Sequence, residues 1–431
     1  MSLLPLGRQN REMKTIYTVL IALYSAIAGV ASLFSVKARR WVRGRRGWRD
    51  RLRSFSRGEG KVAWVHCASL GEFEQGRPVI EKIRTEYPDW KVVITFFSPS
   101  GYEVRKDYKG ADFIMYLPAD LPVNVRFFLN HIKPDLALFV KYEFWYNYLN
   151  ELKKRNVPTY LVSGIFRPDQ YFFRWYGRFA RGVFQVFNRI FVQDEQSGRL
   201  LDSIGYNCYR VTGDTRFDRV SQIAAAAKDL PVIEEFRGGE ALFVAGSSWD
   251  EDEEIIVRYI NSNSGAMKWV IAPHEIDEAH LGRLEKRLAP EAVRYSRYCK
   301  KDSNCRVMII DNIGMLSSVY RYAAVAAVGG GFGRGIHNIL EPACWGIPVL
   351  FGPNHMKFRE AVHLIERGGA VSFDSFETFS SMVEKYLSDP LALKAAGEAC
   401  ASYITENKGS TNKVFNEIFN NQGDENLLKK R

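Results

Sequence analysis

Apolar and polar positions alternate along most of the chain in blocks of two lengths. Apolar runs as long as a strand stand at residues 62–69, 91–98, 112–118, 134–143, 159–164 and 189–194. Amphipathic stretches of helix length lie between them, at residues 74–87, 122–132 and 144–155. Strands that alternate with helices predict a parallel sheet covered by helices on both faces.

The alternation pauses over residues 224–239, which carry alanine, proline and glycine, and then begins again. A second set of apolar runs stands at residues 241–248, 268–274, 306–311, 323–331 and 347–353. We therefore predict an α/β protein with two Rossmann-like, doubly wound domains, at residues 58–225 and 226–420, and a hinge near residues 220–240.

Residues 1–57 form a leader of a different kind. Residues 15–36 carry no charge, and about 20 apolar residues of helix cross the bilayer core. The leader predicts a membrane anchor; a helix lying in the interface and a cleaved signal peptide are the alternatives. The basic block that follows the uncharged run resists translocation, so we expect everything after it to stay on the cytoplasmic side.

The net charge of +11 arises entirely in this leader, which holds 13 basic and two acidic residues. The rest of the chain carries 47 charges of each sign, which argues against a nucleic-acid partner and favours contact with anionic lipid. The six cysteines are scattered without a CxxC pair, as is typical of reduced thiols.

The loop from His66 to Glu72 joins the first predicted strand to the first predicted helix. Ser69 and Gly71 permit a tight turn there, and Glu72 falls near the start of the helix. A carboxylate in that place can act as a general base. It can equally be present only because the helix macrodipole favours an acid in the first turn.

The segment from Lys141 to Asn147 follows another apolar strand and places Glu143 among aromatic residues. A carboxylate in such surroundings needs a partner to remain ionised, and we expect a cation such as Arg167. The alternative is an ordinary helix start.

Two further loops belong to the second domain. Residues 329–343 contain glycines after a strand and before a helix, a geometry that offers backbone N–H groups to a phosphate. Glu341 in that helix can accept from ribose hydroxyls; the alternative is a tight connection between strand and helix. Ser247 and the run from Pro273 to Glu275 follow neighbouring strands. The spacing of His274 and His280 fits no metal site, and no HExxH or GxSxG motif occurs, so we expect neither metal nor acyl-enzyme chemistry.

Several of these loops together resemble the 3-deoxy-D-manno-octulosonic acid (Kdo) transferases over nearly the whole chain. The matching motifs are H-x-x-S-x-G-E at residues 66–72, E-x-W-x-N at 143–147, T-G-x-x-x-F-D at 212–218, Gly246-Ser247, D-x-x-G-x-L at 311–316 and H-N-x-L-E-P-A at 337–343. The resemblance implies the GT-B architecture, with two Rossmann-like domains facing a cleft. It also implies an inverting transfer of Kdo from CMP-Kdo to a lipid A precursor, without a cofactor, at the inner face of the cytoplasmic membrane.

The resemblance also implies roles for single residues. Glu72 becomes the general base, with Ser69, Gly71, Glu143 and Arg167 shaping the acceptor side of the site. The residues expected to bind the donor are Ser247, Pro273, His274, Gly314, Asn338 and Glu341. Pro273 and Gly314 border the nucleotide through their backbones, and Glu341 holds the ribose.

The chain departs from the family pattern at three positions. His274 stands where an arginine is usual, Lys141 where many relatives carry an acid, and Trp249 where many carry a histidine. Arginine is always charged and binds two oxygens at once, whereas histidine does neither. Arg334 or Lys357 is our candidate for the missing charge.

Three other functions compete with Kdo transfer. They are a GT-B transferase that uses a UDP-sugar on a lipid acceptor, a UDP-sugar epimerase of the same architecture, and a membrane-surface scaffold without enzymatic activity. The scaffold leaves Glu72 and Glu341 without a role, and a soluble epimerase has no use for the leader.

Overall fold

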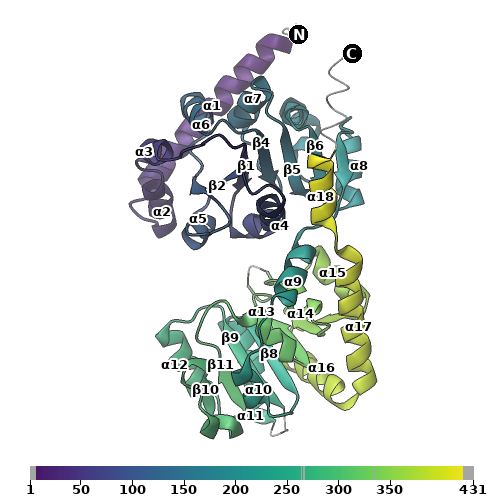
Figure 1. Cartoon of the computed structure of the whole chain (residues 1–431). Coiled ribbons are helices and arrows are strands. Elements are labelled where there is room, and N and C mark those ends of the chain that lie inside the picture. The colour runs from purple at the N-terminus through teal and green to yellow at the C-terminus, as the bar shows by residue number, and fades with distance from the viewer. Residues whose placement is uncertain (1–5, 264, 266, 334, 421–431) are drawn as a thin grey trace. The chain divides into compact units, whose positions relative to one another are not determined.

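The structure is a computed structural model that describes residues 6–263, 265, 267–333 and 335–420. The chain divides into two compact α/β units (Figure 1). Unit 1 joins the chain up to Arg219 with the chain from Gly409 onward, and unit 2 runs from Val220 to Lys408.

Unit 1 is built on a seven-stranded sheet in the order β3-β2-β1-β4-β5-β6-β7, with every neighbouring pair parallel. Its strands are β1 (Val62–Cys67), β2 (Lys91–Phe96), β3 (Phe113–Tyr116), β4 (Leu136–Val140), β5 (Thr159–Gly164), β6 (Arg189–Val192) and β7 (Tyr209–Val211). Its helices are α1 (Leu6–Ala31), α2 (Val36–Gly44), α3 (Trp48–Arg53), α4 (Leu70–Glu86), α5 (Pro99–Arg105), α6 (Pro122–Ile132), α7 (Tyr146–Lys154), η1 (Tyr171–Phe173), η2 (Trp175–Val186), α8 (Glu195–Asp202), the first turn of α9 (Arg216–Ala225), and α18 (Ser410–Phe419).

Unit 2 repeats the plan with a parallel sheet in the order β10-β11-β9-β8-β12-β13-β14. Its strands are β8 (Leu242–Ser248), β9 (Lys268–Pro273), β10 (Ala292–Arg294), β11 (Val307–Ile309), β12 (Val325–Val328), β13 (Val349–Phe351) and β14 (Ala370–Ser372). Its helices are α10 (Pro231–Arg237), α11 (Asp250–Ser262), α12 (Glu278–Arg287), η3 (Tyr295–Arg297), η4 (Lys300–Asn304), α13 (Leu316–Val319), η5 (Tyr320–Tyr322), α14 (Leu340–Cys344), α15 (Arg359–Glu366), α16 (Phe376–Ser388) and α17 (Pro390–Asn407).

The central strands are buried along their whole length, which is why they appear in the sequence as continuous apolar runs. Every residue of β1 and of β4 is buried. The predicted class, two doubly wound parallel sheets, is confirmed. In each sheet the chain order reverses beside the first strand, between β1 and β4 in unit 1 and between β8 and β12 in unit 2. Ligands of such sheets bind at the carboxyl ends of the strands at this point.

The division of the chain differs from the sequence prediction at both ends of unit 2. The boundary falls after Arg219 rather than after residue 225, and α18 belongs to unit 1 rather than to the second domain. The reason is packing: Val414, Phe415 and Ile418 of α18 are buried in the same core cluster as β1. The Asp218 carboxylate fixes the start of the helix by accepting from the backbone N–H groups of Gly409 and Thr411.

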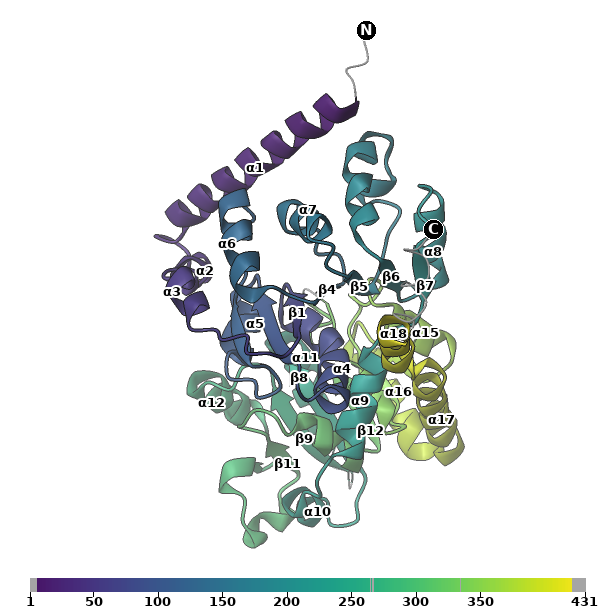
Figure 2. The same cartoon turned by 45° about the horizontal axis from the view of Figure 1, so that its top comes forward.

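The uncharged part of the leader forms α1, which lies beside α6 and α7 of unit 1 (Figure 2). Lys14–Ala31 is one stretch among the described residues that is long and apolar enough to cross a membrane, although a signal sequence passes the same test. Val19, Leu23, Ile27 and Val30 are each more than half exposed. A different side of α1 touches unit 1, where Tyr17 packs on Tyr146.

Candidate functional site

One group of candidate residues lies at the carboxyl edge of the unit 1 sheet. The loop after β1 and the loop after β4 meet there because these strands are parallel neighbours. Ser69 precedes the first residue of α4, and Glu72 lies in the first turn of that helix. The Ser69 hydroxyl donates to Oε2 of Glu72. Nζ of Lys141 stands 3.7 Å from Oε1 of the same carboxylate.

Glu72 is thus a half-buried carboxylate with a hydroxyl on one oxygen and an ammonium near the other. The carboxylate thus contacts one donor and lies near one cation at the start of α4, where the sequence predicts the general base. Lys141 escaped the sequence prediction, because its nearness to Glu72 depends on the order of strands in the sheet.

Glu143 has other partners than the sequence predicted. Its Oε2 accepts from the indole N–H of Trp145 at 3.0 Å and lies 3.5 Å from Nε2 of His66. No ion pair joins it to Arg167 in the part of the chain that the structure describes. Arg167 lies on an exposed loop after β5, where its backbone N–H donates to Gln170. The expected Glu143–Arg167 pair is therefore replaced by a bond to the neighbouring tryptophan.

Tyr142 shows that the predicted acceptor-side residues nevertheless gather in one place. Burial raises the pKa of its hydroxyl, and the carboxylates of Glu72 and Glu143 raise it further, while the Arg167 guanidinium acts in the opposite direction. All three charged groups therefore act on one phenol. Tyr142 was not among the predicted residues, because an exposed tyrosine after a strand gives no signal in the sequence.

Another group of candidate residues lies at the carboxyl edge of the unit 2 sheet. Ser247 lies in β8, at a break in the register between β8 and β9, and adopts the left-handed conformation with φ 52°. Pro273 ends β9 and is buried, and the exposed His274 follows it. Gly314, with φ 103°, precedes α13. The predicted donor-side residues of these loops therefore share one edge of the sheet.

The Glu341 carboxylate is held in a fixed orientation at the start of α14. Its Oε2 accepts from the Ser317 hydroxyl at 2.6 Å, and its Oε1 accepts from the Asn338 side-chain amide at 3.0 Å. A carboxylate oriented in this way can bind the hydroxyls of a ribose. Ser317 was missed because it follows a different strand.

The glycine-rich loop after β12 is bound to the protein more tightly than the sequence predicted. The backbone N–H of Gly329 donates to the Gly246 carbonyl, those of Gly333 and Gly335 donate to the Gly330 carbonyl, and that of Gly330 donates to Oδ2 of Asp252. These four N–H groups are therefore not free to bind a phosphate. Asp252 is almost fully buried, and burial raises its pKa to about 6.

The sequence offered two cations, Lys357 and Arg334, in place of the missing arginine. Lys357 is exposed, and Arg334 lies outside the described residues. Asp250, Glu253 and His280 form a group of metal-ligand type, but Nε2 of His280 contacts Oε1 of Glu253 at 3.1 Å, and Arg283 stands beside both His280 and Asp250. The guanidinium opposes a second cation there, so this group carries no assignment.

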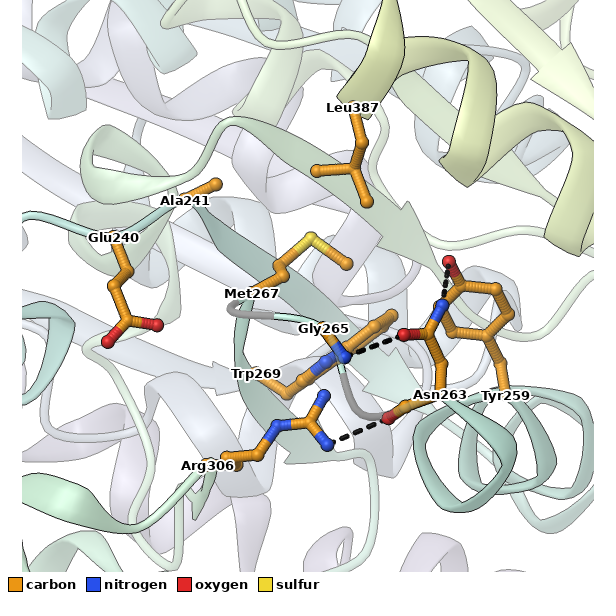
Figure 3. Close-up of a pocket in the computed structure, with 9 residues that line it drawn as sticks. All are labelled: Glu240, Ala241, Tyr259, Asn263, Gly265, Met267, Trp269, Arg306 and Leu387. Carbon is orange, nitrogen blue, oxygen red and sulfur yellow. Dashed lines mark hydrogen bonds between the residues drawn. The ribbon is translucent and has the colours of Figure 1, made fainter.

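A cavity of about 210 Å³ lies elsewhere in unit 2, as Figure 3 shows. Among the residues that line it, Ala241 and Trp269 stand near the amino ends of β8 and β9, and Arg306 precedes β11. It therefore opens at the opposite edge of the sheet from Ser247, Pro273 and Gly314. We do not include it in the site.

Comparison with known proteins agrees with this arrangement. The family model of 3-deoxy-D-manno-octulosonic-acid transferase (kdotransferase) matches residues 46–219. The 3-deoxy-D-manno-octulosonic acid transferase of Chlamydia trachomatis serovar D is 26% identical over 87% of this chain and 90% of the relative. The same transferase of Haemophilus influenzae is 25% identical over 82% of this chain and 85% of the relative.

Among solved structures, the UDP-GlcNAc 2-epimerase of Neisseria meningitidis is similar with a TM-score of 0.55. It is 15% identical, and the match covers 80% of this chain and 99% of the epimerase. At this identity the likeness concerns the fold alone and confirms the GT-B architecture. The family model over residues 46–219 and the relatives that match most of the chain show that the chain is similar to the Kdo transferases, and they support a glycosyltransferase.

Proposed function

We propose that the protein transfers Kdo from CMP-Kdo to a lipid A precursor in lipopolysaccharide synthesis, at the cytoplasmic face of the inner membrane. The observation that carries this proposal is the placement of Glu72. It is a half-buried carboxylate at the carboxyl edge of the unit 1 sheet, in contact with Ser69 and near Lys141. The relatives support the sugar, since they are named for its transfer.

The reaction is a direct displacement with Glu72 as the general base. Glu72 takes the proton from a sugar hydroxyl of the acceptor while the hydroxyl oxygen bonds to the anomeric carbon of Kdo. The bond from that carbon to the phosphate oxygen breaks, and CMP leaves with the electron pair. The configuration at the anomeric carbon is inverted, and no step needs a metal ion. Hydrogen-bond donors on unit 2 stabilise the charge of the leaving phosphate.

The predicted donor-binding residues contact different parts of the nucleotide. Glu341 binds the ribose hydroxyls, Asn338 and Ser247 lie near the phosphate, and Pro273 and Gly314 border the nucleotide. The exposed apolar side of α1, with the basic residues of α2 and α3, provides the membrane contact. Apolar burial in the interface together with attraction to anionic headgroups is the usual basis of such attachment.

The decisive experiment is incubation of the purified full chain with CMP-Kdo and a tetraacylated lipid A precursor, followed by mass spectrometry of the lipid. We expect a product heavier by one or more Kdo residues. Thermal-shift measurements with CMP and UDP serve as the control on the donor. Stabilisation by UDP alone, with no mass change in the lipid, would favour a UDP-sugar enzyme and overturn the proposal.

A further inference from the structure

Three aromatic rings meet at the carboxyl edge of unit 2. Trp249 follows β8, His274 follows β9 and His337 lies on the loop after β12. These three strands are neighbours in the sheet, and the chain order reverses between β8 and β12. The rings therefore stand where a doubly wound sheet binds its ligand.

Trp249 and His337 form a flat plate. The indole Nε1 of Trp249 donates to Nε2 of His337 at 3.0 Å, and the two ring planes differ by only 9°. His274 stacks against both, with ring centroids 4.6 Å from Trp249 and 4.4 Å from His337. Asp252 holds the backbone beside the plate, because its Oδ2 accepts from the backbone N–H groups of both Trp249 and Gly330.

The hydrogen bond determines which nitrogen of His337 carries the proton. An indole N–H can only donate, so Nε2 of His337 must present its lone pair. The neutral ring therefore carries its hydrogen on Nδ1. Burial, with a smaller contribution from His274, lowers the pKa of His337 to about 4, which agrees with a neutral ring.

The remaining ring nitrogens are not engaged by the protein. No residue in the described part of the chain bonds to Nδ1 of His337 or to either ring nitrogen of the exposed His274. The backbone N–H groups of Gly329, Gly330, Gly333 and Gly335 are occupied, as described above. The imidazoles are thus available as hydrogen-bond donors at this edge, whereas the four glycine N–H groups are already bonded within the protein.

We propose that Trp249 is a positioning residue for the donor: by holding Nε2 of His337, it fixes Nδ1–H as the group that donates to the phosphate of the nucleotide. His274, stacked on the plate, is the second imidazole donor to the same phosphate. This inference rests on the proposed function, since it takes a nucleotide sugar to be the ligand.

The test is Trp249→Phe, which keeps an aromatic ring and removes the indole N–H. We expect the Kd for CMP, measured by titration calorimetry on the full chain, to rise about 3- to 10-fold, the effect of one lost hydrogen bond. Trp269→Phe is the matched control, because Nε1 of Trp269 has no partner and lies on β9 away from the rings. It should leave CMP affinity unchanged, and thermal denaturation monitors folding in both variants.

A double-variant cycle separates positioning from general damage. In a His337→Ala background, Trp249→Phe should cause no further loss of CMP affinity, because Trp249 acts through His337. Additive losses would overturn the inference.

Nitrogen-15 spectra of the histidine rings give a readout that needs no ligand. The wild type should show His337 in the Nδ1–H tautomer, and Trp249→Phe should shift part of it to the Nε2–H tautomer. An unchanged tautomer would also overturn the inference. If the wild type binds UDP but not CMP, the proposed function fails. The positioning role of Trp249 is then tested by measuring the Kd of the same variants for UDP.

Discussion

Both units place a tryptophan N–H against a histidine at the carboxyl edge of the sheet, but the two pairs differ in what surrounds them. In unit 1 the Trp145 N–H is shared between Nε2 of His66 and Oε2 of Glu143, at 3.0 Å each. In unit 2 the Trp249 N–H goes to His337, and no carboxylate among the described residues accepts from it.

The difference follows the two tasks that we propose for the edges. His66 is fully buried, with Nδ1 against Thr95, and leaves carboxylates as the reactive groups of unit 1. His337 leaves an N–H available on unit 2. One edge is equipped to accept a proton and the other to donate hydrogen bonds to an anion. The following predictions test that division.

The largest effect should come from Glu72→Gln in unit 1. It keeps the shape of the side chain and removes the carboxylate that takes the proton, so kcat should fall about 10²- to 10⁴-fold. Because we propose that CMP binds to unit 2, its Kd should not change. Rates from the mass-spectrometric transfer assay and calorimetry with CMP check the two halves of this prediction. Full activity in the variant would remove Glu72 from the mechanism.

The next effect concerns stability against pH. Burial raises the pKa of Asp120 in unit 1 to about 6. The protonated carboxyl stabilises the fold by about 3 kcal/mol below pH 3.8. This stabilisation is lost as pH rises through about 6. Asp120→Asn, which resembles the protonated acid, should therefore flatten the dependence of stability on pH between 4 and 7.

The same measurement on unit 2 sharpens the comparison. Like Asp120, Asp252 makes the protein more stable as pH falls, because burial raises its pKa. His337 has the opposite effect: its pKa is lowered to about 4, so the protein loses stability as pH falls from 6.5 through 4. The two groups offset one another, so His337→Phe should reveal the rise in stability on acidification that Asp252 alone produces. Denaturant unfolding at a series of pH values measures both variants, and identical pH profiles for all proteins would contradict the assignment.

A smaller effect is expected for Glu341→Gln in unit 2. The amide still fills the site between Ser317 and Asn338 but is a weaker acceptor than the carboxylate. The Kd for CMP should rise about tenfold, while kcat at saturating donor stays near that of the wild type. A fall in kcat without a change in Kd would place Glu341 in the chemical step and contradict the division between the units.

The smallest effect should come from Tyr17→Phe on α1. The Tyr17 hydroxyl donates to Oδ2 of Asp120 at 2.7 Å, and losing that bond should lower the free energy of unfolding by about 1 kcal/mol. Tyr24→Phe is the control, because its edge-to-face contact with Trp41 and its stacking on Phe97 need no hydroxyl. Equal effects of the two changes would show that α1 is held by ring packing alone.

The sequence predicted the long elements and the loops between them well, because buried parallel strands leave continuous apolar runs. It missed the edge strands β7, β10 and β14, because these three-residue strands are only partly buried and leave no continuous apolar run. It located Glu72, Glu143 and Glu341 on the right loops. It could not supply their partners Lys141, Trp145 and Ser317 because those depend on which strands are neighbours, on side-chain direction and on how loops from different strands meet.

The return of α18 to unit 1 has a consequence for how the protein is made. Phe419 stacks on Tyr87 with ring centroids 4.7 Å apart, and Val414 and Ile418 are fully buried. The unit that leaves the ribosome first therefore lacks part of its core until α18, which follows all of unit 2, has been made. Unit 2 is one continuous stretch that can fold earlier, so the half that begins first is completed last, and a chain released early lacks α18 from unit 1.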